Sequence, residues 1–84
     1  MSKNEIFTKI NSIFRDVFDD KTIMVSESTS AVDIEDWDSL SHIILISAIE
    51  DEFGVRFNMK DVLNMKNVGE MADILAEMTG KHIS

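Results

Sequence analysis

Apolar residues recur every three or four positions in three separate segments of this chain, and that spacing restricts the fold to packed helices more than any other feature does. In the first segment, from about residue 3 to about residue 18, the recurring residues are Ile6, Ile10, Ile13, Phe14 and Val17. Ser2 and Glu5 stand just before this stripe at the spacing of a capping box. The sequence therefore predicts a first helix that begins near residue 3.

A second helix and a short third one are predicted in the middle of the chain. The second runs from Ser39 to Phe53, and Gly54 is placed to end it in the left-handed conformation that glycine adopts without strain. Asn58 is suited to cap a short third helix that ends near Leu63.

The last helix is opened by Asn67 and Glu70, which again have the spacing of a capping box. Gly80 is expected to end it. Its inward stripe is predicted to consist of Val68, Met71, Ile74, Leu75 and Met78.

The segment 19–38 is rich in Ser, Thr and acidic residues, and its length of about twenty residues indicates either a functional loop or an element that the pattern does not reveal. Nothing reads as a strand beyond the short β-favouring run Val55-Arg56-Phe57. We therefore predict an all-α fold, an antiparallel bundle of three main helices plus one short helix, with a long first loop. At 84 residues, the chain is expected to form a single domain spanning 1–84.

Sixteen acidic side chains against eight basic ones give a formal net charge of −8. This charge argues against nucleic acid and anionic membrane surfaces as partners and favours basic proteins. No Lys or Arg occurs between Lys21 and Arg56, so we expect an uncompensated negative field there, although acidic runs are often only solvated faces. The acids in this stretch are Glu27, Asp33, Glu35, Asp36, Asp38, Glu50, Asp51 and Glu52.

The chain contains no cysteine, which excludes disulfides and thiolate metal sites and suits a reducing compartment. The first five residues lack the layout of a signal peptide, and no apolar run approaches the roughly 18 to 20 residues that span a bilayer. We expect a soluble, cytoplasmic monomer without membrane insertion. No metal site is predicted, because the segment 33–41 fits no EF-hand register and His42 and His82 alone make no ligand set.

The second helix has two unlike faces. At about 100° per residue, one face should turn toward the core and carries His42, Leu45, Ile46, Ile49 and Phe53. The opposite face carries Leu40, Ile44, Ser47 and Asp51, with Ile43 and Ala48 at its edges. Exposed apolar residues rimmed by acids are typical of a surface that docks and releases partners, although single exposed apolar residues are also common. We interpret Leu40 and Ile44 as a recognition strip.

Ser39 is predicted to lie in the first turn of this helix, where unpaired N–H groups and the helix dipole favour an attached phosphate. The residue is a poor nucleophile, because no Gly-x-Ser-x-Gly elbow surrounds it and no oxyanion hole or catalytic set is identifiable. The chain is therefore predicted not to be an enzyme. A serine here could simply cap the helix, but Asp38 can provide that cap instead. We interpret Ser39 as the substrate of another enzyme.

The run Asp-Trp-Asp-Ser-Leu-Ser-His from Asp36 to His42, followed by an apolar helix and Gly54, resembles the prosthetic-group attachment region of acyl carrier proteins. The resemblance covers nearly the whole chain. It implies that Ser39 carries 4'-phosphopantetheine from coenzyme A, with Asp38 as the neighbouring acid and Leu40 as the following apolar residue. It also implies that the segment 19–38 is the family's long first loop, folded back over the bundle.

The same resemblance implies that acyl or aminoacyl groups are carried as thioesters and presented to other enzymes. The implied partners are a phosphopantetheinyl transferase and acyl-transferring or condensing enzymes with basic docking surfaces. Asp38 is expected to meet Arg or Lys on them, in contacts that tune encounter rate more than affinity. The expected partner-binding residues are Leu40, Ile44, Ser47, Glu50, Asp51 and Glu52.

Three positions depart from the pattern of fatty-acid carriers. Trp37 stands before Asp38 where a small residue is typical, Ser41 follows Leu40 where an acid is typical, and Ile44 replaces an outward acid. We therefore hypothesise a carrier for a specialised pathway, such as a polyketide-like, aminoacyl or lipid-modifying system, rather than for housekeeping fatty-acid biosynthesis. Trp37 has a plainer interpretation too, in which its indole covers the edge of the core.

The alternative function is a non-covalent acidic helical adaptor, in which the second helix binds a basic protein without any prosthetic group.

Methionine is an adaptable side chain, and several of the six methionines could line a plastic groove that, in a carrier protein, admits an acyl chain between the second and third helices. Met71 and Met78 are expected to belong to the core instead.

Overall fold

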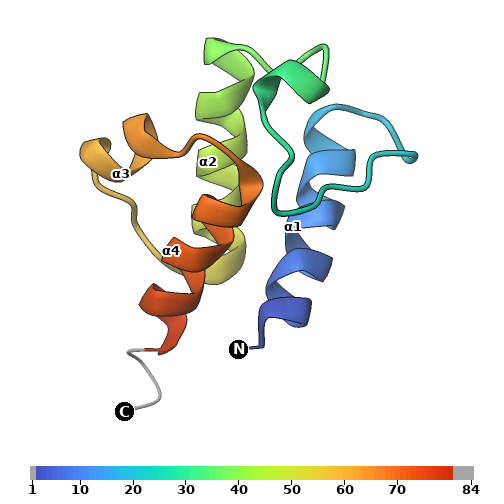
Figure 1. Cartoon of the computed structure of the whole chain (residues 1–84). Helices are drawn as coiled ribbons and strands as arrows, with labels where there is room; N and C mark the ends of the chain where they lie inside the picture. Colours follow the sequence, from blue (N-terminus) through green and yellow to red (C-terminus); the bar gives the residue numbers. More distant parts are fainter. Residues whose placement is uncertain (1, 81–84) are drawn as a thin grey trace.

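The structure is a computed structural model that describes residues 2–80, and all the regular elements in that range are helices (Figure 1). The elements are α1 (Lys3–Val17), the short 3₁₀ helix η1 (Ala31–Asp33), α2 (Ser39–Phe53), α3 (Met59–Asn64) and α4 (Val68–Gly80). No strand occurs in the part of the chain that the structure describes, the run 55–57 included. The predicted bundle of three main helices and one short helix is confirmed.

The predicted helix ends are set by residues close to them in the sequence. Ser2 and Glu5 form the capping box of α1, Asn58 Oδ1 accepts from the Asp61 N–H at 2.8 Å, and Gly54 ends α2 with φ 64°. At α4, Asn67 Oδ1 accepts from the Glu70 N–H at 2.8 Å. The second half of the box predicted there is wrong, because the Glu70 carboxylate accepts from the N–H of Lys66 instead.

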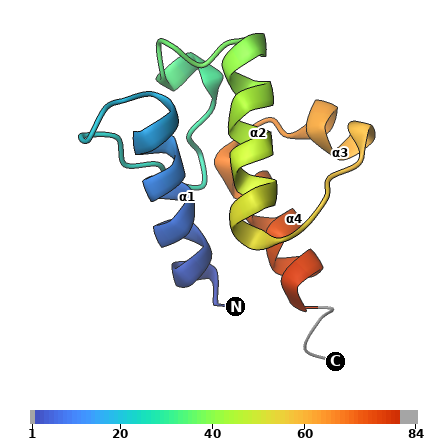
Figure 2. The ribbon, with the colours of Figure 1, turned by 180° about the vertical axis from the view of Figure 1, so that it is seen from behind.

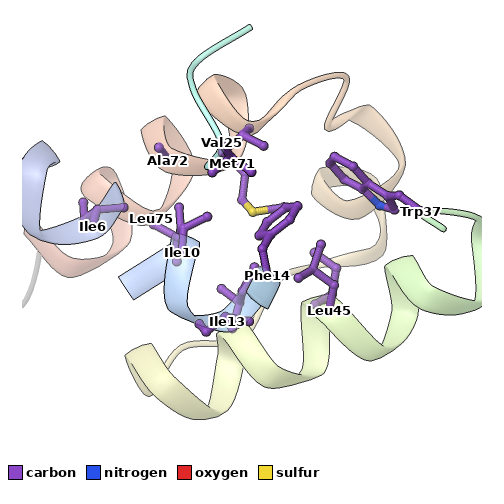
Figure 3. Close-up of a cluster of buried hydrophobic side chains, with 13 residues drawn as sticks. Ile6, Ile10, Ile13, Phe14, Val25, Trp37, Leu45, Met71, Ala72 and Leu75 are labelled. Carbon is purple, nitrogen blue, oxygen red and sulfur yellow. The ribbon is translucent and has the colours of Figure 1, made fainter. Parts of the chain in front are cut away.

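The core lies where α1 meets α2 and α4, the two helices in closest backbone contact with it. Both helices run antiparallel to α1, as the two opposite views show (Figures 1 and 2). In the close-up, side chains from α1, α2 and α4 converge around Phe14 (Figure 3). The buried core consists of Ile6, Ile10, Ile13, Phe14, Val25, Trp37, Leu45, Ile46, Ile49, Val68, Met71, Ala72 and Leu75.

The core differs from the predicted one in a few members. Ile74 and Met78 of the α4 stripe are half-buried, whereas Ala72, absent from that stripe, is fully buried. Val25 and Trp37 enter the core from the connection between α1 and α2. The plainer interpretation of Trp37 is therefore confirmed, since its indole is 8% exposed and packs edge-on against Phe14, with ring centroids 5.2 Å apart.

The long connection is fixed to the bundle through its backbone. The Val25 N–H donates to Asn11 Oδ1 of α1 at 2.6 Å. Farther along, the carbonyls of Glu27 and Thr29 accept from the N–H groups of Gly69 and Val68 at 2.9 and 2.8 Å, so the connection caps the start of α4. It is an ordered loop that includes η1, and it folds back over the bundle as expected.

Two lysines of α1 reach into the acidic stretch. Lys3 forms ion pairs with Glu27 and with Asp73, and Lys9 pairs with Glu52 at 3.2 Å. The expectation of a wholly uncompensated field is therefore wrong, because basic residues distant in sequence neutralise part of it. None of the helices within residues 2–80 combines the length and the apolar character needed to cross a membrane.

Candidate functional site

Ser39 is the first residue of α2, and its side chain is exposed. Its hydroxyl forms no hydrogen bond with any residue that the structure describes. The start of α2 lies beside η1, at the end of the bundle opposite the N-terminus of the chain (Figure 1). The hydroxyl is therefore open to a macromolecular catalyst approaching that end.

The cap of α2 is built without Ser39. The Ser41 N–H donates to Asp38 Oδ1 at 2.9 Å, and the Asp38 N–H donates to Ser41 Oγ at 2.8 Å, so the two residues form a reciprocal capping box. The Ser41 hydroxyl also donates to the Asp36 carbonyl at 2.8 Å. Ser41, which departs from the typical acid, thus has a structural role that its position three residues after Asp38 could have indicated.

The charge at this end of α2 follows from the same contacts. Hydrogen bonds from the Ser41 N–H and then from the Ser41 hydroxyl lower the pKa of the Asp38 carboxyl below its ordinary value of 3.8, so it is ionised at neutral pH. No acidic residue occupies the first turn of α2 itself. The ionised Asp38 carboxylate at the N-cap offsets part of the positive charge of the helix N-terminus, and the remainder favours a phosphodiester on Ser39, the linkage that the sequence implies.

The outward face of α2 carries an apolar strip, as predicted. Leu40 is 70% exposed and Ile44 is 52% exposed, and Ile43, expected only at the edge of this face, is 65% exposed. Ser47 and Asp51 are also exposed on α2. We call Leu40, Ile43 and Ile44 the apolar strip below.

Two of the predicted partner-binding acids already have partners within the chain. Glu50 is half-buried, and its carboxylate accepts from the Phe57 N–H at 2.8 Å, which ties α2 to the segment before α3. Glu52 pairs with Lys9. Asp51, in contrast, makes no ion pair with any described residue. The structure therefore leaves Asp51 as the freest acid near the C-terminal end of α2.

A groove of about 800 Å³ runs between α2 and the segment that contains α3, and Ser39 is among the residues that line it. Sequence reasoning placed an adaptable region between these helices but did not identify the residues. Met59 and Met65, two of the six methionines, were the available signal. The groove is lined by Ala31, Trp37, Asp38, Ser39, His42, Ile43, Ile46, Ser47, Glu50, Phe57, Met59, Val62, Met65 and Lys66.

One hydrogen-bonded pair stands in the wall of this groove. The Trp37 Nε1–H donates to Nδ1 of His42 at 3.0 Å, and the two rings are stacked with their centroids 5.8 Å apart. His42 was expected to face the core; it is half-buried and lines the groove instead of joining the fully buried set. Sequence reasoning missed this pair.

No cluster of three or more His, Cys, Asp or Glu side chains with the geometry to hold a metal ion occurs among the residues described. The other histidine, His82, lies outside the described residues. The features gathered at this end of the bundle are thus an exposed serine, an apolar strip and a groove beside them.

Comparisons with known proteins all identify the same family. A family profile described as a phosphopantetheine attachment site matches residues 8–75. The chain is 38% identical over 79 residues to the acyl carrier protein of Acidothermus cellulolyticus, covering 94% of each chain, and 36% identical over 76 residues to that of Picosynechococcus sp., covering 90% of this chain and 94% of the relative.

A solved structure shows the same arrangement of helices. It is the solution NMR structure of holo acyl carrier protein from Geobacter metallireducens, which superposes with a TM-score of 0.87 at 37% identity and covers 93% of this chain and 90% of that one. The likeness extends over nearly the full length of both proteins.

Proposed function

Because the chain belongs to the acyl carrier protein family, we propose that Ser39 is the residue to which its prosthetic group is attached. That group is 4'-phosphopantetheine, bound covalently, and the chain is a carrier rather than a catalyst. When attached, the group supplies the thiol that holds an acyl chain as a thioester. The polypeptide has no cysteine of its own to do so.

The observation that carries the assignment is the exposed, unbonded hydroxyl at the start of α2. A serine that capped the helix would accept a hydrogen bond from a first-turn N–H, but Asp38 and Ser41 already form the cap. Attachment to Ser39 therefore costs α2 none of its own contacts. The helix N-terminus favours the anionic phosphodiester by less than about 1 kcal/mol, because the Asp38 carboxylate already interacts with the same end of the helix.

As a family member, the chain interacts with a phosphopantetheinyl transferase and with acyl-processing enzymes. We propose that these partners dock on the apolar strip, with Ser47 and Asp51 beside it. The strip follows Ser39 along the exposed side of α2, and its three exposed apolar side chains offer a contact to apolar side chains of a partner. Asp38 and Asp51 would contact basic residues of the docking enzyme. Glu50 and Glu52 could do so only after giving up their contacts with the Phe57 N–H and with Lys9.

The groove between α2 and the segment that contains α3 is a candidate binding site for the acyl chain. Its lining is largely apolar and includes Ser39, so a chain tethered there reaches it without leaving the surface of its own carrier. Burial in the groove would shield the apolar part of the cargo from water. We therefore propose that an acyl chain occupies this groove between encounters.

The departures in this region support a specialised pathway. Ile44 makes the exposed face of α2 more apolar than an acidic residue would. The electrostatic attraction between this face and a basic docking surface is therefore weaker. We propose that the chain serves a dedicated set of enzymes as a monomer in the cytoplasm. Efficient acylation and elongation of the holo protein by a general set of fatty-acid synthase enzymes would contradict this specialisation.

Intact-mass measurement tests the attachment site directly. Incubation with coenzyme A and a phosphopantetheinyl transferase of broad specificity should add the mass of one phosphopantetheine to the wild type and nothing to Ser39→Ala. Ser12→Ala is the matched control, because Ser12 is an exposed serine on α1 and not on α2, and this variant should be modified like the wild type.

Two outcomes would overturn the assignment. Modification of Ser39→Ala would place the prosthetic group elsewhere. An unmodified wild type that still binds a basic protein partner would instead favour the alternative function, a non-covalent acidic adaptor.

A further inference from the structure

The indole of Trp37 connects the first loop to α2 through one side-chain hydrogen bond. Its Nε1–H donates to Nδ1 of His42 at 3.0 Å, and the planes of the two rings lie 26° apart. The indole itself is 8% exposed and packs edge-on against Phe14 of the core. Because both Trp37 and His42 line the groove, this hydrogen bond lies in the groove wall.

Two side-chain hydrogen bonds join the segment 30–37 to α2 in the part of the chain that the structure describes. One is the bond from Trp37 to His42, and the other runs from the Ser41 hydroxyl to the Asp36 carbonyl at 2.8 Å. A hydroxyl and a backbone carbonyl keep their charge near neutral pH, whereas an imidazole does not. Of these two connections, only the one at His42 can therefore respond to pH.

The hydrogen bond from Trp37 requires a neutral imidazole. Nδ1 of His42 can accept only while it carries no proton, so the ring proton resides on Nε2 in this structure. In the imidazolium both ring nitrogens are donors, so neither orientation of the ring offers the indole an acceptor. The Trp37 N–H would then face a positively charged donor, and a largely buried donor without an acceptor is costly. Protonation of His42 thus removes the bond and leaves the indole N–H without a partner.

Three charged residues share the groove with His42. Asp38 comes from the end of the first loop, Glu50 from α2 and Lys66 from the segment after α3. Neither α1 nor α4 contributes a residue to the lining. An imidazolium in this groove would therefore have two opposite charges and one like charge around it. Histidine side chains in general change their charge between about pH 5 and pH 8.

We propose that the hydrogen bond between Trp37 and His42 is a pH switch in the groove wall, which holds the indole against α2 while His42 is neutral and releases it when His42 is protonated. The stability that the bond contributes is complete above the titration range of histidine and is lost as the pH falls through that range. Trp37 stands two residues before Ser39, so the release alters the surface beside that serine. The switch does not depend on the prosthetic group, and the unmodified chain should have it as well.

The chain is suited to a direct test, because Trp37 is its only tryptophan and it has no tyrosine. Tryptophan fluorescence and the NMR signal of the indole N–H therefore both report on this one side chain. The unmodified protein is measured from about pH 8 to about pH 5.5, a range in which histidine titrates and most carboxylates stay ionised. As the pH falls, we expect the emission maximum to move to longer wavelength, quenching by acrylamide to increase, and the indole N–H signal to move upfield.

Three variants assign the response to His42. His42→Asn is the matched control, because Oδ1 of asparagine is bonded to Cγ as Nδ1 of histidine is, and it accepts a hydrogen bond without titrating. This variant should keep the spectrum of the neutral form at every pH, whereas His42→Leu, which has no acceptor, should resemble the acidic form at every pH. From pH 8 to pH 5.5, the melting temperature of the wild type should fall by about 4 °C relative to His42→Asn, the effect of one hydrogen bond in a domain of this size. His82→Gln removes the other histidine and should respond like the wild type.

Several results would overturn the switch. They are an emission maximum and an indole N–H signal that do not change over this range, an equal response in the wild type and His42→Asn, and a response that disappears in His82→Gln. Within the wild type alone, the ring signals of His42 and the indole signal of Trp37 must change over the same pH interval, so different intervals would also contradict it. Failure of the attachment at Ser39 would leave this pH response in place, and absence of the response would leave the attachment unaffected.

Discussion

The two sides of α2 are built differently, and the difference explains how one helix can hold the bundle together and still border an open groove. Toward α1, Leu45 and Ile49 are fully buried against a dense set of apolar side chains. Toward α3, the same helix borders a groove of about 800 Å³. The closed side fixes α2 in place, so the open side can change its contents without unfolding the bundle.

The open side also has the weaker framework. α3 is only six residues long and is not among the helix pairs in close backbone contact, which are α1 with α2 and α1 with α4. Met59 at its start is 72% exposed. Short helices with few packed neighbours open at low free-energy cost, which suits the wall of a groove that we propose to hold the cargo.

The sharpest test of this comparison is a matched pair of truncations, Leu45→Ala on the closed side and Val62→Ala on the open side. Leu45 is fully buried, so its truncation leaves a cavity and should cost about 3 kcal/mol of unfolding free energy. Val62 is half-buried in the groove wall and should cost less than about 1 kcal/mol. Urea denaturation measures both. Equal costs would show that the two sides are packed alike.

The second prediction concerns the two backbone hydrogen bonds that join the first loop to the start of α4. A Cβ at Gly69 would lie 2.7 Å from the carbonyl oxygen of Glu27, so Gly69→Ala must push the loop away despite the better helix propensity of alanine. We expect a loss of about 2 kcal/mol. Gly54→Asn is the control, since nothing lies within 4 Å of a Cβ there and asparagine tolerates φ +64°. A neutral Gly69→Ala would mean that the loop is not held at this point.

Local sequence signals account for the helices because each signal lies within a few residues of what it determines. The predicted helix ends are found at Ser2, Asp38 and Asn58, which cap helix starts, and at Gly54, which ends α2. The exposed face of α2 follows from helical periodicity alone. The position of Ser39 at the start of α2 was predictable for the same reason. Its role as the attachment residue stays a proposal.

What could not be predicted depends on residues far apart in the chain. The loop carbonyl of Glu27 meets Gly69, Lys3 and Lys9 neutralise acids of other segments, and Glu50 binds the backbone at Phe57. No periodicity within one helix encodes such contacts. The bond between Trp37 and His42 spans only five residues, but it forms because the core holds the indole, so it too required the tertiary structure.

The third prediction tests the cap that leaves Ser39 free on the open side. The folded-state pKa of Asp38 is lowered, so its contribution to stability is complete above the ordinary value of 3.8 and is lost as the pH falls through the folded-state value. Asp38→Asn keeps a good capping residue but cannot titrate. We expect the melting temperature of the wild type to fall more steeply than that of Asp38→Asn as the pH drops from about 5 to about 2. Parallel curves would show that the cap does not depend on the carboxylate.

The smallest expected effect is that of the ion pair on the closed side. Lys9→Gln removes the contact with Glu52, whereas Lys60→Gln removes an exposed lysine of α3 that makes no ion pair with any described residue, and both change the net charge equally. At low salt, Lys9→Gln should be less stable than Lys60→Gln by less than about 1 kcal/mol. Because the chain carries a charge of −8, moderate salt should raise the melting temperature of all three proteins by screening repulsion, while shrinking the gap between the two variants. A gap that salt leaves unchanged would indicate that Lys9 acts through its packing over the Phe53 ring, whose centroid lies 5.9 Å from Nζ, rather than through its charge on Glu52.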